Sequence, residues 1–210
     1  MNVLAIGAHP DDIELGCFGT LAAHRKKGDK IFGLILTQGE LVGDPKKRLK
    51  ETKDAANLID MKLFFGNFQD GNLKEDSSLV SYLDEIIKNC KINVVYTHSP
   101  HDRHQDHRAV AQASISASRY LNELYSYESP SVVYPFNPQL FIDVTDTFKS
   151  KIKAIKVHKT QKNKTFMRIE AVEGLAKFRA YQAGRQKRLC EGFEVHKIWY
   201  ENFSKKPKSR

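Results

Sequence analysis

The chain has 210 residues, of which 40% are hydrophobic and 28% are charged. This length suggests one globular domain that buries roughly 70% of its unfolded surface, and the composition excludes a disordered chain. The formal net charge is +9, but the cations are spread along the chain and do not alternate with aromatic residues in one block. That distribution argues against a nucleic-acid-binding protein. A solvated surface explains most of the cations, and an anionic substrate or partner explains some of them.

The first half of the chain alternates predicted strands with predicted helices. Residues 2–7 form an apolar run typical of a buried strand, and a helix is expected over 12–28. The nearly continuous apolar run 31–37 is typical of a strand that is covered on both faces. A helix is expected over 45–58, where a proline suits the first turn, and a short strand over 62–65.

The second half continues the alternation, with apolar residues at helical or strand spacing. The expected elements are a helix around 79–87, a strand at 92–96, a helix around 109–117, strands at 131–134 and 139–143, and helices around 148–155 and 169–185. This order predicts an α/β fold, Rossmann-like, with a mainly parallel sheet flanked by helices on both faces. We expect a single domain over residues 1–203 and a basic, mobile tail over 204–210.

The termini and the cysteines indicate a cellular compartment. Cys17, Cys90 and Cys190 lie far apart and no CxxC pair exists, which argues against a disulfide framework and against a zinc ribbon. The N-terminal apolar run has no basic region before it and breaks at His9, unlike a signal peptide. No run approaches the ~20 apolar residues of a membrane span. We therefore expect a cytoplasmic protein with reduced thiols and no membrane span.

Polar residues gather where the first strand ends, in the sequence AIGAHPDDIELGCFGT of residues 5–20. A histidine and two carboxylates at the end of a buried strand are costly unless they bind something or are well paired. His9, Asp11 and Asp12 are therefore candidates for half of a metal site. Asp11 with Glu14 three residues later also resembles a capping box, so the carboxylates could simply cap the following helix.

A cluster of histidines follows the fourth strand, in the sequence THSPHDRHQDH of residues 97–107. His104 and His107 are three residues apart and would share one face of a helix. Because ligands of open α/β sheets bind beyond the carboxyl ends of the strands, the two clusters are expected to meet there. Two imidazoles, one carboxylate and an open position form the pattern of catalytic zinc, although other divalent metals fit. Zinc in such a site lowers the pKa of a water to about 7 and polarises a carbonyl, and Asp11 could take the proton.

Taken together, HPDD followed by G-x-x-GT, with a later D-x-H-x-DH, resembles the LmbE-like, PIG-L-type family of zinc-dependent N-deacetylases. The resemblance implies that zinc is bound by His9, Asp12 and His107. It further implies that Asp11 is the general base. His104 would stabilise the oxyanion or protonate the leaving amine.

The resemblance also implies supporting residues and exposes two departures. Asp106 would orient one of the histidines. An R-x-x-E-x-x-x-A segment after the second strand would turn Arg48 toward the substrate, although Arg48 could instead be one more exposed helix charge. Phe18 stands where the family usually has glycine, which is expected to narrow the pocket, and Gly192 stands where alanine is common.

Other polar residues near these motifs are expected to have structural roles. His98 and His101 have no matching position in the family and are expected in a surface loop. Asp70, in the sequence QDG, is expected to be a turn residue. Tyr125 and Tyr127 fit either a sugar pocket or core packing.

The resemblance implies a zinc-dependent hydrolase that removes an acetyl group from an N-acetylated sugar or glycoconjugate of the N-acetylglucosamine type. The excess of cations favours an anionic substrate, and similar proteins are usually homo-oligomers. One alternative is a non-catalytic carbohydrate- or metal-binding protein that retains the site, but the intact Asp11 beside all three ligands argues against it. Only the positive net charge suggests the other alternative, a nucleic-acid-binding protein.

Overall fold

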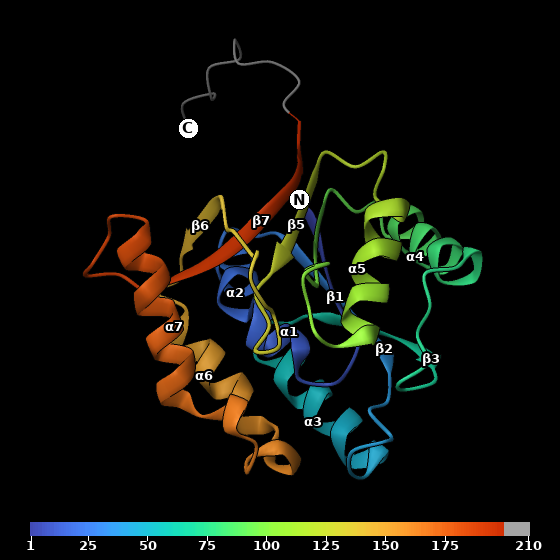
Figure 1. The fold of residues 1–210 in the computed structure, drawn as a ribbon, viewed down its shortest axis with the longest axis horizontal. Helices are drawn as coiled ribbons and strands as arrows, with labels where there is room; N and C mark the ends of the chain where they lie inside the picture. The colour runs from blue at the N-terminus through green and yellow to red at the C-terminus, as the bar shows by residue number, and fades with distance from the viewer. Residues whose placement is uncertain (200–210) are drawn as a thin grey trace.

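The computed structural model describes residues 1–199, which form one seven-stranded sheet covered by helices on both faces (Figure 1). The strands are β1 (Asn2–Gly7), β2 (Lys30–Thr37), β3 (Lys62–Phe68), β4 (Val94–Thr97), β5 (Glu123–Tyr127), β6 (Leu140–Asp143) and β7 (Cys190–Ile198). The helices are α1 (Asp12–Gly16), α2 (Phe18–Lys26), α3 (Pro45–Asn57), α4 (Ser77–Asn89), α5 (Gln105–Ala117), α6 (Phe148–Val157) and α7 (Ile169–Gln182), with two short 3₁₀ helices, η1 (Lys159–Gln161) and η2 (Thr165–Met167). Within residues 1–199, no helix is long and apolar enough to cross a membrane.

The sheet is mainly parallel, as the sequence predicts. Its strand order is β3-β2-β1-β4-β5-β7-β6, and every neighbouring pair among the first five strands of this order is parallel. Strand β7 runs antiparallel to both of its neighbours, β5 and β6. The chain is therefore a single α/β domain with one antiparallel strand inserted near an edge.

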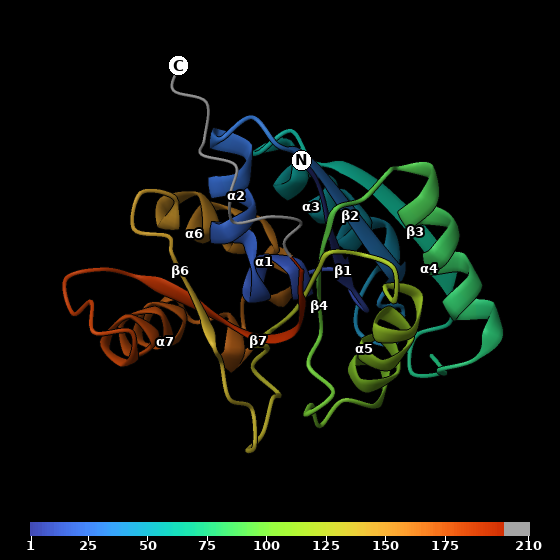
Figure 2. The same ribbon diagram turned by 90° about the horizontal axis from the view of Figure 1, so that it is seen from above.

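Strand β1 lies inside the sheet and supplies both hydrophobic cores. Val3 and Ala5 belong to the core under α1, α2, α3 and α6, whereas Leu4 and Ile6 belong to the core under α4 and α5. Successive side chains of a strand point to opposite faces, so an uninterrupted apolar run is needed when both faces are covered. Figure 2 shows the sheet between these two helical layers. The polar residues that follow β1 thus lie at the end of a strand that is buried on both faces.

The single helix expected over 12–28 is instead two helices that meet at Cys17. The backbone of Cys17 leaves the helical region, with φ −144° and ψ 13°. The preceding residue, Gly16, packs directly on the ring of Tyr127, where a Cβ would lie 2.6 Å from Cγ. The sequence pattern over 12–28 is continuously helical, so it could not predict a break caused by a contact with β5.

The strand expected at 131–134 does not form, and two strands that do form, β5 and β7, were not predicted. Residues 131–134 form a turn-rich segment with one isolated bridge, between Val132 and Asp102. Prolines at both ends, Pro130 and Pro135, have no N–H to donate to a ladder. Strands β5 and β7 form in segments that the sequence pattern did not assign. The tail expected over 204–210 lies outside the described residues.

Candidate active site

The carboxyl ends of the parallel strands bring the two polar clusters to one edge of the sheet. A cleft of about 460 Å³ opens there. Six of the predicted site residues line it: His9, Asp11, Asp12, Arg48, His104 and His107. The seventh, Asp106, is fully buried beneath the cleft. Residues about ninety positions apart in the sequence therefore share one wall, because β1 and β4 are neighbours in the sheet.

His9, Asp12 and His107 converge on one point of the cleft wall. Nδ1 of His9 lies 3.3 Å from Nε2 of His107. Nδ1 of His9 is 3.4 Å from Oδ2 of Asp12, and Nε2 of His107 is 3.4 Å from Oδ1 of Asp12. A tetrahedral ion with bonds of about 2.0–2.1 Å separates its ligand atoms by about 3.4 Å. The three side chains thus fit the coordination sphere of such an ion.

Carboxylates hold the opposite nitrogen of each imidazole. Nε2 of His9 lies 3.0 Å from Oδ1 of Asp70 and 3.3 Å from Oδ2 of Asp106. Nδ1 of His107 lies 2.9 Å from Oδ2 of Asp102. A carboxylate keeps the proton on the nitrogen that faces it, and this leaves the lone pair of the other nitrogen free. The free nitrogens are therefore the two that converge on Asp12, as a metal site requires.

Asp70 lies in a turn, as expected, but it also contacts His9, and Asp102 had been given no role. Asp70 is buried against His9 as well as following a strand, so it is more than a turn residue. Asp102 is buried, and Ser129 Oγ donates a short hydrogen bond to its Oδ2. A signal for Asp102 existed in the sequence, since it opens the D-x-H-x-DH motif. No comparable signal marks Asp70.

His98 was expected in a surface loop but is fully buried. Its Nε2 lies 3.1 Å from Oδ2 of Asp12, and its ring stacks on His107 with centroids 3.8 Å apart. Burial, with a smaller contribution from the charge of His107, lowers the pKa of His98 to about 4. A neutral imidazole therefore packs against the carboxylate of Asp12, and the same Nε2 accepts a hydrogen bond from the amide of Ala8 at 3.1 Å. His101, by contrast, has a side chain 41% exposed, in keeping with the expected loop.

The charges around the three converging residues favour a cation. Burial alone would lower the pKa of His9, but contacts with Asp106, Asp12 and Asp70 outweigh it and raise the pKa to about 12. Burial likewise opposes protonation of His107, yet Asp12 and Asp102 raise its pKa to about 9. These shifts show a strongly negative field at the two imidazoles. A divalent ion would satisfy the same field, so the donor set fits a metal in charge as well as in geometry.

Asp11 lies beside this group in an uncommon backbone conformation. Its φ is 106°, in the left-handed region, and its side chain makes no capping hydrogen bond to α1, so the capping-box interpretation is wrong. Burial and the neighbouring charge of Asp12 raise the pKa of Asp11 to about 7, against the opposing charge of Arg48. A non-glycine residue at such a φ costs free energy, and strain of this kind concentrates at functional sites.

Arg48 is a buried contact of the site and not an exposed helix charge. It is 4% exposed, and its Nη2 donates to the carbonyl of Pro10 at 2.6 Å and to Oδ2 of Asp11 at 3.3 Å. Its Nη1 donates to the carbonyl of Gly39 at 3.0 Å. Arg48 therefore joins the loop after β2 to the loop after β1 while one face lines the cleft.

His104 and Asp106 occupy the first turn of α5. His104 is the N-cap, where Nδ1 accepts a hydrogen bond from the amide of Asp106 at 3.2 Å, and its ring lies 4.8 Å from that of His9. Burial and the charges of His107 and His9 lower the pKa of His104. Asp106 accepts from the amides of Gly71 at 2.7 Å and Leu73 at 3.2 Å, which fixes its carboxylate beneath His9.

Three aromatic residues that were considered for the pocket, Phe18, Tyr125 and Tyr127, are buried in the core. Phe18 is fully buried in the core under α2 and does not line the cleft, so the expectation that it narrows the pocket is wrong. Tyr125 and Tyr127 belong to the same core, and Tyr127 donates to the carbonyl of Ile6 at 2.8 Å. Core packing, and not a sugar pocket, describes both tyrosines.

Comparison with known proteins identifies the family of this chain. The sequence profile of the GlcNAc-PI de-N-acetylase (PIG-L) family matches residues 4–118, and the chain belongs to that family. The chain is 40% identical to the uncharacterized deacetylase YaiS of Escherichia coli K12 over 168 residues, which are 76% of this chain and 91% of YaiS.

Solved structures share the fold. The N,N'-diacetylchitobiose deacetylase of Pyrococcus horikoshii superposes with a TM-score of 0.82 at 22% identity, over 92% of this chain and 83% of that chain. GalB, the 4-carboxy-2-hydroxymuconate hydratase of Pseudomonas putida, also reaches a TM-score of 0.82, at 18% identity over 97% of this chain and 99% of that chain. A deacetylase and a hydratase on one scaffold mean that the reaction must be argued from the site.

Proposed function

We propose that this protein is a metal-dependent hydrolase that removes an acetyl group from an N-acetylated sugar or glycoconjugate. The observation that carries the proposal is the convergence of His9, Asp12 and His107 beside Asp11 in one cleft. Membership of a de-N-acetylase family, the deacetylase name of the relative from Escherichia coli and the structural likeness to a diacetylchitobiose deacetylase support it. They also support an N-acetylglucosamine-type substrate.

Zinc is the metal we propose. Two imidazole nitrogens and one carboxylate oxygen are a common zinc donor set, although other divalent ions accept it too. His9, Asp12 and His107 would hold the ion. When bound, it would supply a water-derived nucleophile at neutral pH and polarise the amide carbonyl.

The chain's own residues would move the protons. Water adds to the acetyl carbon, the C–N bond breaks, and acetate and a free amine leave. Asp11 would take the proton of the attacking water, because its raised pKa, about 7, suits a base near neutral pH. His104, whose ring lies beside those of His9 and His107, would stabilise the oxyanion or protonate the leaving nitrogen. Arg48, in contact with Asp11, would hold that carboxylate in place and face the substrate. Asp106, whose carboxylate is fixed beneath His9, would orient that ring.

Basic residues beside the cleft support an anionic substrate. Five lysines line a groove between α3 and α6: Lys47, Lys50, Lys153, Lys156 and Lys159. Within residues 1–199, Lys153, Lys156 and Lys159 form no ion pair. Thr160 lines this groove, and its neighbour Gln161 lines the cleft, so the groove and the cleft are adjacent. A substrate bound in the cleft could therefore place a negatively charged group in the groove. Binding through these lysines would weaken as salt rises.

The proposal is tested by acetate release. The purified protein is incubated with a panel of N-acetylglucosamine conjugates, neutral and anionic, with mass detection of the free amine, after chelation and after addition of zinc. We expect zinc-dependent release of one acetyl group from at least one member. Binding of these conjugates with no release under any metal would instead indicate a non-catalytic carbohydrate-binding protein.

A further inference from the structure

A second, smaller cavity adjoins the active-site cleft between α1, α7 and the start of β7. Its volume is about 160 Å³. Apolar side chains of α7 form much of its wall, and they are Ala171, Val172, Leu175 and Ala176. Leu15, Pro130 and Phe166 line both this cavity and the cleft. Because Leu15 stands three residues after Asp12 on α1, the shared wall begins one helical turn from the candidate metal ligands.

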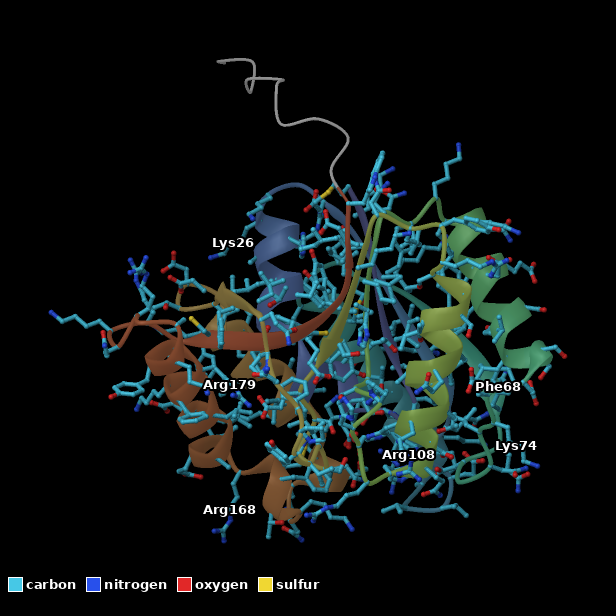
Figure 3. All side chains as sticks on the ribbon, turned by 45° about the horizontal axis from the view of Figure 1, so that its top comes forward. Lys26, Phe68, Lys74, Arg108, Arg168 and Arg179 are labelled. Carbon is cyan, nitrogen blue, oxygen red and sulfur yellow. The ribbon has the colours of Figure 1, made fainter. Side chains whose placement is uncertain are left out.

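The charged groups around the cavity are already paired with one another. Lys151 Nζ lies 2.5 Å from Glu191 Oε1 and donates to the carbonyl of Leu15 at 2.7 Å. Arg179, which Figure 3 labels beside α7, forms two hydrogen bonds with Glu128, from Nε at 2.8 Å and from Nη2 at 2.5 Å. A bidentate pair of this kind leaves little charge for another ligand. The cavity therefore suits a neutral, apolar group.

The lining of the cleft contains both polar and apolar side chains. The exposed polar residues among them, Gln105, Lys164 and Thr165, suit the hydroxyls of a sugar. Leu15, Pro130 and Phe166 form the part next to the small cavity. The remaining apolar residues of the cleft, Leu41 and Val42, lie in the loop after β2 and are 69% and 45% exposed. An acyl group that points from the metal ligands toward Leu15 would thus reach the small cavity, and the sugar would lie among the polar side chains of the cleft.

The volume of the cavity indicates the size of that acyl group. An apolar protein cavity of about 150 Å³ holds one benzene molecule, which has six carbon atoms. We propose that the small cavity binds the acyl chain of an N-acylated sugar, and that chains of about six carbons are removed in preference to acetyl. This inference rests on the proposed function. The reaction is unchanged: water adds to the acyl carbon, the C–N bond breaks, and a carboxylate and an amine leave.

The first test is a chain-length series on one sugar. The zinc-loaded full chain is assayed for kcat/KM with N-acetyl, N-butanoyl, N-hexanoyl and N-decanoyl glucosamine. Each buried methylene contributes about 0.8 kcal/mol, or roughly fourfold. We expect kcat/KM for hexanoyl to exceed that for acetyl by roughly tenfold or more, and to fall again for decanoyl. A steady fall from acetyl onward would overturn the inference while leaving the deacetylase proposal intact. Hydrolysis of none of them would contradict both.

Cavity-filling variants provide the second test. Ala171 and Leu175 line the cavity from the exposed side of α7, so Ala171→Trp and Leu175→Trp should fill it without disturbing the core. We expect each to reduce the hexanoyl-to-acetyl ratio of kcat/KM by roughly tenfold. Lys177→Trp, on the same helix but outside the cavity, is the matched control and should keep the wild-type ratio. The ratio is measured within one variant, so a loss of folded protein cancels, and unchanged ratios in both cavity variants would overturn the inference.

Discussion

The two nitrogens of His107 have different partners, and this decides how the ring can act. Nδ1 faces Asp102 at 2.9 Å, and Nε2 faces Asp12. Replacing Asp102 by asparagine removes the charge that fixes the tautomer. Asp102→Asn should therefore lower zinc affinity by roughly 10- to 100-fold, measured by chelator competition. Asp54→Asn, at an exposed pair with Lys50, is the control and should bind zinc as the wild type does. Equal affinity in Asp102→Asn would contradict the assigned role.

Asp29, far from the cleft, provides a pH-dependent test of stability. Burial alone would raise its pKa, but hydrogen bonds with the N-terminal ammonium and with His24 hold the pKa below its ordinary value. A carboxyl with a lowered folded pKa stabilises the fold above its ordinary pKa and loses that contribution as pH falls. Asp29→Asn should thus reduce the free energy of unfolding by roughly 1 kcal/mol near pH 7, and by less below about pH 4. A difference that is the same at pH 3 and pH 7 in urea titrations would refute this.

Site residues that belong to a sequence motif could be predicted. Site residues outside the motifs, which contact the others only in the folded chain, were missed. His9, Asp12 and His107 could be paired because each belongs to a dense polar cluster at a strand end. His98 and Asp70 are isolated in sequence, and their burial depends on which loops fold over the sheet edge. A single sequence does not contain that information.

The break between α1 and α2 shows how one contact reshapes an element. Gly16→Ala would force a methyl group into the ring of Tyr127. Overpacking a tight core costs roughly 1–3 kcal/mol, so the free energy of unfolding should fall by about that amount in denaturant titrations. The control is Gly174→Ala in α7, where a new Cβ meets no atom within 4 Å. That variant should be as stable as the wild type or more so, because alanine favours a helix. Equal stability of Gly16→Ala and the wild type would show that the contact can relax.

Elements with strong periodicity were predictable, and elements defined by pairing were not. Strands β1 and β2 are continuous apolar runs, and α4 places Leu79, Leu83 and Ile87 on one face. Strand β7 carries charged residues along its length and forms because β5 and β6 pair with its two edges. Its stability comes from neighbours that lie far away in sequence, so local pattern was a poor guide.

For the whole molecule, the negative field at the sheet edge makes metal binding and folding interdependent. A ligand that binds only the folded state at 100 times its Kd adds about 2.7 kcal/mol of stability. For a chain of this size, saturating zinc should therefore raise the Tm by roughly 5–10 °C. His107→Ala should lose most of this increase and most of the bound zinc, measured by calorimetry and elemental analysis. An equal increase and an equal zinc content in His107→Ala would exclude it as a ligand.

We propose that Asp11 performs the proton transfer of a metal-dependent deacetylation. Asparagine has nearly the same shape and tolerates the left-handed backbone of this position, so Asp11→Asn should fold and bind zinc normally. The decisive measurement is acetate released per bound zinc by the wild type and by Asp11→Asn, on the same substrate. We expect equal zinc content and a turnover roughly 10²- to 10⁴-fold lower in the variant. Near-wild-type turnover by zinc-loaded Asp11→Asn would contradict the account.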